Sequence, residues 1–496
     1  MTRAATPVNF TLALNGRSGP RASQVAHALI EAIAAGHVHD GDKLPSTRTL
    51  ATTFGLPRTA TVGAYEELVA AGFLVARPGG STYVEQGAAA AARAGTFGTP
   101  LPPEAPPERP PAGQTEFDLR PGQADTTLIS PRDWAQAMRL AAPPAREPAD
   151  PDDLRPGVSN GDAYGELREQ LSGHMRRARG LAADPDDIFL FPSLATGLRA
   201  VAAGCGLAGG QAAFEDPGYG KARVALAEGG VTVRPVPVDD DGLRVGELGP
   251  ADRACYVTPA HQYPLGSRMS VRRRAALLDW AAAGDALVLE DDYDGEFRYD
   301  VPPLIPLRSM PAGAERVVYF GTSSKILARG MRVSWAVVPA RYRAGLTAYL
   351  DRAGGAVSCV SAAFLASFIA TGALTRHQAR AMRTYSARQA RFVAACRELI
   401  PGVRALGIEA GLHVVLAFGQ PRDDVAVTAR LAGLGLACSP LSRFYADPAS
   451  PSRTGLVCGY SRLPETRARD AARLIGQVLA RPSDDGPVAQ ELQHRG

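Results

Sequence analysis

The sequence predicts two folded parts, a small module of helices with a β-hairpin and a larger α/β domain. Three observations support this prediction. A chain of 496 residues is too long for one ordinary domain. Three helical patterns and two short strand patterns fall within residues 17–86. Helical and strand patterns then alternate over residues 116–481, which favours an α/β domain with a mainly parallel sheet.

The composition indicates a globular protein without a strong bias toward one kind of partner. Hydrophobic residues make up 45% of the chain, and a net charge of +4 does not by itself indicate nucleic-acid binding. The six cysteines form no C-x-x-C pair, so we expect reduced thiols and no metal site. No apolar run is long enough to span a bilayer, and the N-terminus lacks the apolar core of a signal peptide. We therefore expect a cytoplasmic protein.

Residues 17–86 carry the pattern of a winged helix-turn-helix. Apolar residues recur at four-residue spacing in the first helix, and Ser46 is placed to cap the second. The turn Pro78-Gly79-Gly80 joins two strand patterns into a small hairpin. The first helix is predicted over residues 21–35, the second lies between Ser46 and Gly55, and the third is opened by residues 56–59 and ends at Gly72. The two strands are predicted over residues 73–77 and 81–84.

The third helix of this motif places its N-terminal end in the major groove of DNA. Arg58, Thr59 and Thr61 stand at that end, where we expect them to reach base edges and phosphates. Arg48 and Arg77 are placed for contacts to the sugar-phosphate backbone, which orient a protein on DNA without reading its sequence. Basic and acidic residues nearly balance in this module, so charge leaves open the alternative of a protein-interaction module.

Four stretches of the module carry a recognisable pattern: residues 41–51, Arg58, residues 64–68 and residues 72–74. The first reads Gly-Asp-Lys-Leu-Pro-Ser-Thr-Arg-Thr-Leu-Ala. Together they resemble the GntR family of bacterial transcription regulators, which implies double-stranded DNA as a partner. Pro57 departs from the Ser or Thr that is usual in the family, and Ala60 from a frequent Thr. Proline fits the first turn of a helix, so these departures bear on base contacts and not on the fold.

Two segments outside the folded parts are expected to lack a core. Residues 87–115 are rich in Ala and Pro, which predicts a semi-extended linker. Residues 482–496 are polar and are expected to be a disordered tail. The large domain is therefore predicted to span residues 116–481.

The large domain contains short apolar runs suited to buried strands. They are residues 188–191, 254–257, 286–290, 317–320 and 335–338. Ligands of open α/β sheets bind at the carboxyl ends of the strands. Polar clusters of this sequence follow the strands, which is where such ligands bind.

Three of these clusters are ambiguous when taken singly. Ser193, Leu194 and Ala195 follow a strand and open a helix, whose free N–H groups suit a phosphate. Tyr219 follows a sharp turn and is placed either to stack on a flat ring or to be buried in the turn. His261 lies with Gln262 in a polar loop after another strand.

Two further clusters indicate a defined chemistry. Residues 290–299 pack acids directly after an apolar strand, where Asp291 and Tyr293 stand close together; metal binding by these carboxylates is an alternative. Residues 321–332 place Lys325 after another strand, with hydroxyls at Thr322 and Ser324 and a guanidinium at Arg332. A carboxylate for the pyridine nitrogen, a phenol for the ring oxygen and an amine that forms an imine are what pyridoxal phosphate needs.

The order of these motifs resembles the fold-type I aminotransferases. A GntR-like module joined to such a domain resembles the MocR subfamily of transcription regulators. The resemblance runs from about residue 21 to residue 479 and includes Gly161, Asp162, Gly165, Leu167 and Arg168. It implies a pyridoxal 5'-phosphate-dependent aminotransferase fold, and a homodimer that binds paired half-sites on DNA.

The resemblance also implies a role for each candidate residue. Lys325 would be the catalytic Schiff-base residue, with Asp291 at the pyridine nitrogen and Tyr293 at the ring oxygen. Tyr219 would stack on the ring, and His261 falls in a His-Gln-aromatic-Pro loop typical of the subfamily. The phosphate would be held by a set of hydroxyl, backbone and guanidinium groups: Ser193, Leu194, Ala195, Thr196, Thr322, Ser324 and Arg332.

Departures from the family pattern bear on function. Ser193 and Ser334 stand where Gly is usual, Ser323 where Phe is usual, Leu265 where Thr is usual and Arg329 where Pro is common. Lys221 occupies a position where some members carry a substrate-binding arginine. Val457 stands where transaminating relatives carry the arginine that binds the substrate carboxylate, and Arg453 is nearby but out of register.

Two functions are therefore expected. The first is a regulator that uses pyridoxal phosphate to sense the cofactor itself or an amino compound such as GABA or taurine. The second is an active aminotransferase with an accessory DNA-binding module. The missing arginine favours the regulator, because a buried unpaired carboxylate is costly. The His-Gln-Tyr-Pro loop and Ser193 favour the subgroup that responds to pyridoxal phosphate and controls its biosynthesis.

Overall fold

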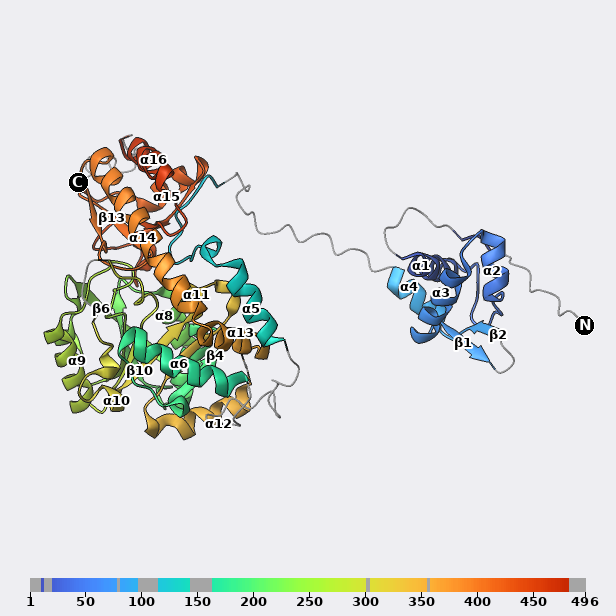
Figure 1. The fold of residues 1–496 in the computed structure, drawn as a ribbon, viewed down its shortest axis with the longest axis horizontal. Helices are drawn as coiled ribbons and strands as arrows, with labels where there is room; N and C mark the ends of the chain where they lie inside the picture. Colours follow the sequence, from blue (N-terminus) through green and yellow to red (C-terminus); the bar gives the residue numbers. More distant parts are fainter. Residues whose placement is uncertain are drawn as a thin grey trace, which may run out of the picture. The chain divides into compact units, whose positions relative to one another are not determined.

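The computed structural model describes residues 10–12, 20–77, 81–96, 115–142, 163–299, 304–354 and 357–480 of the chain. The chain divides into two compact units, residues 1–112 and 113–496 (Figure 1). The turn predicted at residues 78–80 and the tail predicted at residues 482–496 lie outside the described residues. So do Gly161, Asp162 and most of the predicted linker.

The N-terminal unit is the winged helix-turn-helix that the sequence predicts. Its elements are α1 (Arg21–Ala34), α2 (Thr47–Phe54), α3 (Arg58–Ala70), β1 (Leu74–Arg77) and β2 (Ser81–Val84). The two strands pair in antiparallel fashion. Ser46 caps α2 by accepting the N–H of Thr49 at 3.1 Å. Val25, Leu29 and Leu68 from α1 and α3 are buried in one small core.

A fourth helix, α4 (Ala88–Thr96), follows the hairpin where the sequence predicts a semi-extended linker. Ala88 and Ala92 pack against the core of the N-terminal unit. The carboxylate of Asp40 accepts the N–H groups of Gly87 and Ala89, both at 2.8 Å, at the start of this helix. The linker prediction is wrong for this segment, because its alanines favour a helix and the prolines come only later in the interval.

An eight-stranded sheet forms the centre of the large unit, in the order β4-β11-β10-β9-β8-β5-β6-β7. The strands are β4 (Ile188–Phe191), β5 (Gln211–Asp216), β6 (Thr232–Asp239), β7 (Gly242–Leu243), β8 (Asp252–Val257), β9 (Leu287–Asp291), β10 (Val317–Thr322) and β11 (Ser334–Val337). The strands from β10 to β6 pair in parallel, whereas β11 and β7 are antiparallel to their neighbours. The predicted mainly parallel sheet is confirmed.

Both faces of this sheet are buried, which explains why its strands read as continuous apolar runs. Tyr256 and Val318 pack into a core with α6, α7 and α13, whereas Cys255 and Val317 pack into a second core with α9. Successive residues of a strand therefore point to different helical layers. The helices of this part are α5 (Pro131–Ala141), α6 (Ala163–Arg179), α7 (Leu194–Gly204), α8 (Gly220–Glu228), α9 (Val271–Ala283), α10 (Gly313–Arg316), α11 (Ser323–Ile326), α12 (Arg343–Ala353) and α13 (Cys359–Ala370).

The C-terminal elements gather at one end of the large unit, in orange and red in Figure 1. They comprise the long helix α14 (Ala373–Leu399), α15 (Asp424–Gly433), α16 (Ala468–Ala480) and the strands β12 (Val403–Leu406), β13 (His413–Phe418), β14 (Leu436–Ala437), β15 (Ser439–Pro440) and β16 (Gly455–Gly459). Four of these strands form a sheet in the order β12-β13-β16-β15. The short strand β3 (Phe117–Asp118), from the start of the unit, pairs with β14.

No single helix among the described residues is long and apolar enough to cross a membrane. The bent pair α13 and α14 reaches the required length and composition only when the two helices are taken together. Most of α13 is buried in the core of the large unit.

Candidate functional site

The surface predicted to contact DNA presents four of its five residues to solvent. Arg58 and Thr59 are exposed at the N-terminal end of α3. Arg48 on α2 and Arg77 on β1 are exposed as well, and the Arg77 guanidinium lies 4.5 Å from the ring centre of Tyr83. Exposed cations at a helix N-terminus and on the wing are what phosphate contacts require.

Thr61 does not fit the predicted DNA contact. Its side chain is 0% exposed, and its hydroxyl lies 3.1 Å from the carbonyl of Thr47 and 2.9 Å from that of Arg58. The residue therefore joins α2 to α3 instead of reaching a base. The prediction is wrong because position 61 falls one turn into α3, on the face that packs against α2.

In the large unit, the strand register brings the predicted cofactor residues to one edge of the sheet. Phe191 at the end of β4 and Thr322 at the end of β10 both pair with Ser334 of β11. Phe320 pairs with Asp291 at the end of β9. The segments that follow these strand ends carry the phosphate-loop residues, Lys325 and Tyr293. This is the carboxyl edge, where open α/β sheets bind their ligands.

The phosphate-loop residues form the N-terminus of α7. Ser193 caps the helix, with its hydroxyl accepting the N–H of Thr196 at 3.1 Å and lying 2.9 Å from the Thr196 hydroxyl. The N–H groups of Leu194 and Ala195 lie in the first turn and have no partner within the helix. These two groups and the positive end of the helix dipole suit an anion.

Lys325 lies on α11, directly after β10. Its Nζ donates a 2.5 Å hydrogen bond to the carbonyl of Gly122. Burial, and after it the positive charge of Arg329, lower the pKa of Lys325 from 10.5 to about 8. An amine with such a pKa has a larger neutral, nucleophilic fraction near pH 7 than an ordinary lysine.

Hydroxyl groups line the chain on both sides of Lys325. The Thr322 hydroxyl accepts the Ser324 N–H at 3.2 Å and the Ser334 hydroxyl at 3.1 Å. Arg332, seven residues after Lys325, has a left-handed backbone with φ 53° and an exposed side chain. In the described part of the chain, Arg332 forms no ion pair. Thr322 and Ser324 are half-buried and Arg332 is exposed, so their predicted contact with a phosphate stays a prediction.

Asp291 is buried at the end of β9 and receives a hydrogen bond from a tyrosine. The Tyr256 hydroxyl donates to its Oδ2 at 2.5 Å, and the Tyr256 ring stacks on Phe214 at 4.5 Å. Burial raises the pKa of Asp291 to about 7. Because Asp291 forms no ion pair among the described residues, this carboxyl is available to a cationic or protonated nitrogen.

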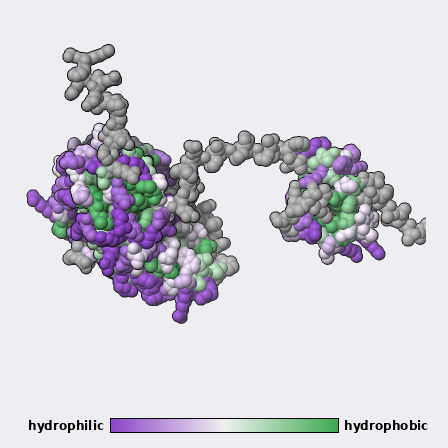
Figure 2. Space-filling model, turned by 90° about the horizontal axis from the view of Figure 1, so that it is seen from above, coloured by the Kyte–Doolittle hydropathy of each residue, from purple (hydrophilic) through white to green (hydrophobic). Residues whose placement is uncertain are grey.

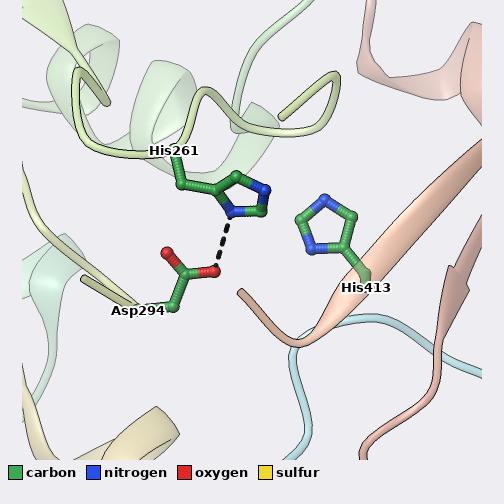
Figure 3. Close-up of side chains that lie close together, drawn as sticks. All are labelled: His261, Asp294 and His413. Atoms are coloured by element: carbon green, nitrogen blue, oxygen red, sulfur yellow. Dashed lines mark hydrogen bonds and ion pairs between the residues drawn. The ribbon is translucent and has the colours of Figure 1, made fainter. Parts of the chain in front are cut away.

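Tyr293 and His261 meet a third residue, Asp294. The Nδ1 of His261 lies 3.1 Å from Oδ2 of Asp294 and 3.0 Å from the Tyr293 hydroxyl. Figure 3 shows His413 of β13 beside His261 and Asp294 (Figure 3). The Nε2 of His413 lies 2.9 Å from the carbonyl of Pro264. One ligand atom from each of His261, Asp294 and His413 lies within 4.8 Å of the other two, a spacing that a metal ion could also use.

Tyr219 and the His-Gln-Tyr-Pro loop form the wall of the site. Tyr219 lies at the N-cap of α8 and packs edge-on against Tyr263, with ring centres 5.5 Å apart. The Gln262 amide donates to the carbonyls of Pro217 and Tyr263, both at 2.8 Å, and to Glu215 at 3.2 Å. Gln262 therefore fixes the two loops that carry Tyr219 and His261, which is a supporting role.

Glu290 and Asp292, the acids on either side of Asp291, support the fold. Glu290 accepts the N–H groups of Leu307 at 2.8 Å and Arg308 at 3.2 Å. Asp292 forms a buried ion pair with Arg179 at 2.5 Å. Because successive strand residues point to opposite faces, Asp291 lies at the site while its neighbours do not.

The positions discussed for substrate binding lie as follows. Val457 is fully buried within β16, and Arg453 is exposed before that strand begins. Lys221 and Arg329 are exposed. Burial is the main cause of the lowered pKa of Lys325, and the positive charges of Arg329 and Lys221 lower it as well. No arginine of β16 therefore faces the site.

Several residues of the site were missed in the sequence. Asp294 follows Tyr293 directly and stands in the acidic run, so its position carried a signal. Tyr256 lies in a predicted strand, where its polar hydroxyl among apolar neighbours was the cue. His413 and Gly122 come from segments distant in sequence, and no local pattern indicates them.

Comparisons with known proteins support both parts of this description. A family profile described as "Bacterial regulatory proteins, gntR family" matches residues 21–84. The HTH-type pyridoxine biosynthesis transcriptional regulator PdxR of Corynebacterium glutamicum is 30% identical over 90% of this chain and 93% of its own length. The probable rhizopine catabolism regulatory protein MocR of Rhizobium meliloti is 29% identical over 93% of this chain and 94% of its own.

Solved structures match the large unit. The kynurenine aminotransferase of Pyrococcus horikoshii superposes with a TM-score of 0.64 at 22% identity, over 73% of this chain and 90% of its own. The α-aminoadipate aminotransferase LysN of Thermus thermophilus gives the same TM-score at 20% identity, over 74% of this chain and 92% of its own. The large unit therefore has the fold-type I aminotransferase fold.

Proposed function

Because this chain belongs to the MocR family of GntR-type transcription regulators, we propose that it binds pyridoxal phosphate at Lys325 and uses that site to control its binding to double-stranded DNA. The observation that carries the proposal is the half-buried amine of Lys325, whose pKa is lowered to about 8, at the sheet edge that also holds Asp291 and Tyr293. A DNA-binding unit on the same chain makes a sensing role the natural use of such a site.

The groups present at this edge fit the cofactor. The buried carboxyl of Asp291 has a phenol as donor but no ion pair among the described residues, which suits a pyridine nitrogen. The N–H groups of Leu194 and Ala195, the hydroxyls of Thr322 and Ser324 and the guanidinium of Arg332 supply donors for a phosphate. When bound, the cofactor would supply an aldehyde that reacts with amines and a ring that withdraws electrons.

Lysine is rare in this chain, which gives chemical support to a role for Lys325. Lysine occurs at three positions only, 43, 221 and 325, among 54 basic residues. Arginine replaces lysine in ion pairs without loss of charge, but a guanidinium cannot provide the primary amine that a carbonyl compound needs. Lys325 is the half-buried one of the three, whereas Lys43 and Lys221 are exposed.

We propose pyridoxal phosphate itself or an amino compound as the effector, and genes of vitamin B6 biosynthesis or of amine and amino-acid metabolism as targets. The names of the relatives support both choices, since one concerns pyridoxine biosynthesis and another rhizopine catabolism. The apolar Val457 in place of a carboxylate-binding arginine favours sensing over transamination. Since the target is chromosomal DNA, the proposed location is the cytoplasm.

We further propose that the regulator acts as a homodimer. Exposed apolar side chains lie on three helices of the large unit that contact one another: Met138 and Leu140 of α5, Val360 of α13 and Met382 of α14. Figure 2 shows an apolar area on the large unit within a mostly hydrophilic face (Figure 2). Paired DNA-binding units in a two-fold dimer would contact paired half-sites.

The test compares the purified full-length chain with its Lys325→Ala variant, each with and without added pyridoxal phosphate. The wild type should gain an absorbance band at the edge of the visible range, and borohydride reduction should fix the cofactor to the peptide that contains Lys325. The variant should show neither result. DNA binding to the intergenic region upstream of the gene should change at least fivefold, or about 1 kcal/mol, on cofactor addition to the wild type only.

Lys43→Arg is the matched control for the spectroscopic part, because it removes one of the other two lysines, which belongs to the N-terminal unit. It should keep the band. An unchanged spectrum in the wild type would contradict cofactor binding. Rapid conversion of added GABA, taurine or a common amino acid, with loss of the band, would instead establish the aminotransferase alternative.

A further inference from the structure

Asp294 and His413 have no role in the function proposed above, yet both lie against His261. Asp294 is 1% exposed, His413 1% and His261 2%. They come from three different segments, namely the turn after β9, strand β13 and the loop after β8 (Figure 3). Buried polar groups cost free energy unless each donor meets an acceptor. The positions of the protons among these three side chains therefore matter for the site.

One nitrogen atom decides that arrangement. His261 Nδ1 lies within hydrogen-bonding distance of both the Asp294 carboxylate, at 3.1 Å, and the Tyr293 hydroxyl, at 3.0 Å. A ring nitrogen of neutral histidine either carries a hydrogen and donates, or carries a lone pair and accepts. If Nδ1 donates to Asp294, the Tyr293 hydroxyl keeps its own proton for another acceptor. If Nδ1 accepts from Tyr293, the hydroxyl proton lies in that hydrogen bond and is not available to another acceptor.

The surroundings hold the His261 ring in place. Gly411 has a φ of +85°, and a Cβ there would lie 2.5 Å from both His261 Nδ1 and Asp294 Oδ2. The backbone of Gly411 therefore lies directly against the pair and excludes water from it. A Cβ at Gly266 would lie 2.9 Å from His261 Nε2 on the other side of the ring. The buried ring therefore lies close to the backbone at both Gly411 and Gly266.

The Asp294 carboxyl, 3.1 Å from Nδ1, is the acceptor that favours a proton on this nitrogen. Burial lowers the pKa of His413 to about 3, so this neighbouring ring is neutral. Burial is the largest cause that raises the pKa of Asp294, and Asp292 raises it as well. His261 and Lys325 act in the opposite direction. Burial keeps the pKa of the Tyr293 hydroxyl well above the ordinary value, and Asp294, Tyr263 and Asp291 raise it as well. Tyr293 thus stays a protonated donor.

We propose that Asp294 keeps the Nδ1 of His261 protonated and thereby directs the Tyr293 hydroxyl proton to the ring oxygen of the bound cofactor. Asp294 and His261 are positioning residues in this scheme, because they act through Tyr293. The inference rests on the proposed binding of pyridoxal phosphate. It adds a means by which the chain sets the pKa of the lysine-bound cofactor.

The first experiment needs neither a variant of Asp294 nor the cofactor. Nitrogen NMR of cofactor-free wild-type protein, labelled at its eight histidines, reports which ring nitrogen carries hydrogen. The His261 signals are assigned by their loss in His261→Gln. A hydrogen on Nδ1 is expected. A hydrogen on Nε2 with a bare Nδ1 would overturn the proposal, whether or not the protein binds pyridoxal phosphate.

The second experiment is a double-mutant cycle on the cofactor-loaded protein. A donor to the ring oxygen stabilises negative charge there, so its loss should raise the pKa of the lysine-bound cofactor, read from absorbance against pH. Asp294→Asn and Tyr293→Phe should each raise this pKa by about one unit. The double variant should match Tyr293→Phe alone. Additive shifts, or no shift in Asp294→Asn, would overturn the proposal.

Two controls test whether the effect is specific to Asp294 and whether a metal ion occupies the cluster. Glu228→Gln changes an exposed carboxylate that pairs with Arg199 and lies at the end of α8 opposite Tyr219, and it should leave the pKa unchanged. Native mass spectrometry of the purified wild type should show no bound zinc. One zinc per chain that is lost in His413→Ala would overturn the proposal, because Nδ1 would then be a metal ligand. If no absorbance band forms in the wild type, the proposed function fails while the NMR result still decides the proton position.

Discussion

The Nζ of Lys325 donates a 2.5 Å hydrogen bond to the carbonyl of Gly122, 203 residues earlier in the chain. Gly122 follows β3, the first strand after the linker interval, and this segment is held by the C-terminal part of the large unit. The Leu119 N–H donates to Ala437 at 2.8 Å, and the Leu119 carbonyl accepts from Gly459 at 2.7 Å. The segment that leads from the DNA-binding unit thus ends in contact with the proposed cofactor lysine.

Substitution of Gly122 by Ala should impair cofactor binding. A Cβ at this position would overlap with the Lys325 amine, and the φ of +73° adds backbone strain of about 1 kcal/mol. The expected result is a loss of cofactor affinity of tenfold or more in an absorbance titration. Gly206→Ala is the matched control, since Gly206 has a φ of +70° with no atom within 4 Å of the added Cβ. It should lose stability but not affinity; equal affinity in both variants would contradict the prediction.

Attachment of the cofactor should depend on pH through Lys325. Only the neutral amine attacks a carbonyl, and the lowered pKa of about 8 means that the neutral fraction rises as the pH increases through that value. The rate of band formation in stopped-flow absorbance should increase about tenfold per unit below pH 8 and level off above it. A rate that keeps rising beyond pH 9.5 would indicate an ordinary lysine.

Arg329 provides a second check on the same electrostatics. After burial, its positive charge is the next cause of the lowered pKa of Lys325. Arg329→Gln should therefore move the midpoint of the rate profile to higher pH. Because Arg329 is exposed, the shift should shrink when salt is added. A midpoint that does not move would assign the lowered pKa to burial alone.

The sheet and its ligand edge were predictable because they depend on local patterns. Strands buried on both faces read as apolar runs, and the polar residues after Phe191, Glu290 and Phe320 mark strand ends wherever they occur. Lys325 and Asp291 follow from that logic. The sequence does not indicate which of the acids lies at the site and which supports the fold, because Asp291 and Asp292 differ only in the face of the sheet that they occupy.

Contacts between distant segments were beyond the reach of sequence patterns. The carbonyl of Gly122 and the ring of His413 reach the site only through the tertiary fold, and neither residue stands in a distinctive local context. Thr61 illustrates the opposite error. It stands at the expected end of a recognition helix, but one helical turn decides whether a side chain faces DNA or α2.

Arg58 and Thr61 should separate DNA contact from stability. Arg58→Ala removes an exposed cation and should weaken DNA binding at least tenfold with little change in unfolding. Thr61→Val removes a buried hydroxyl bonded to backbone carbonyls and should cost the N-terminal unit about 1 kcal/mol. Fluorescence anisotropy and thermal unfolding measure the two effects. If Thr61→Val reduced affinity without reducing stability, the contact assigned to α2 would be wrong.

The buried ion pair between Arg179 and Asp292 should be far more important than the exposed pairs. Both side chains are 1% exposed, the two atoms are 2.5 Å apart, and the Tyr319 hydroxyl donates to the same carboxylate at 2.7 Å. Arg179 also donates to the Gly295 carbonyl at 2.8 Å, so it fixes the turn that carries Tyr293 and Asp294.

Arg179→Met should therefore destabilise the large unit by about 3–5 kcal/mol, because it leaves Asp292 buried without a cation. Arg199→Met breaks the pair with Glu228, whose side chains are 38% and 54% exposed, and should cost less than about 1 kcal/mol. Denaturant unfolding followed by tryptophan fluorescence compares the two. Similar small losses would show that the buried pair contributes little beyond its packing. A large loss confined to Arg179→Met would mean that the fold itself depends on the turn that presents Tyr293 to the site.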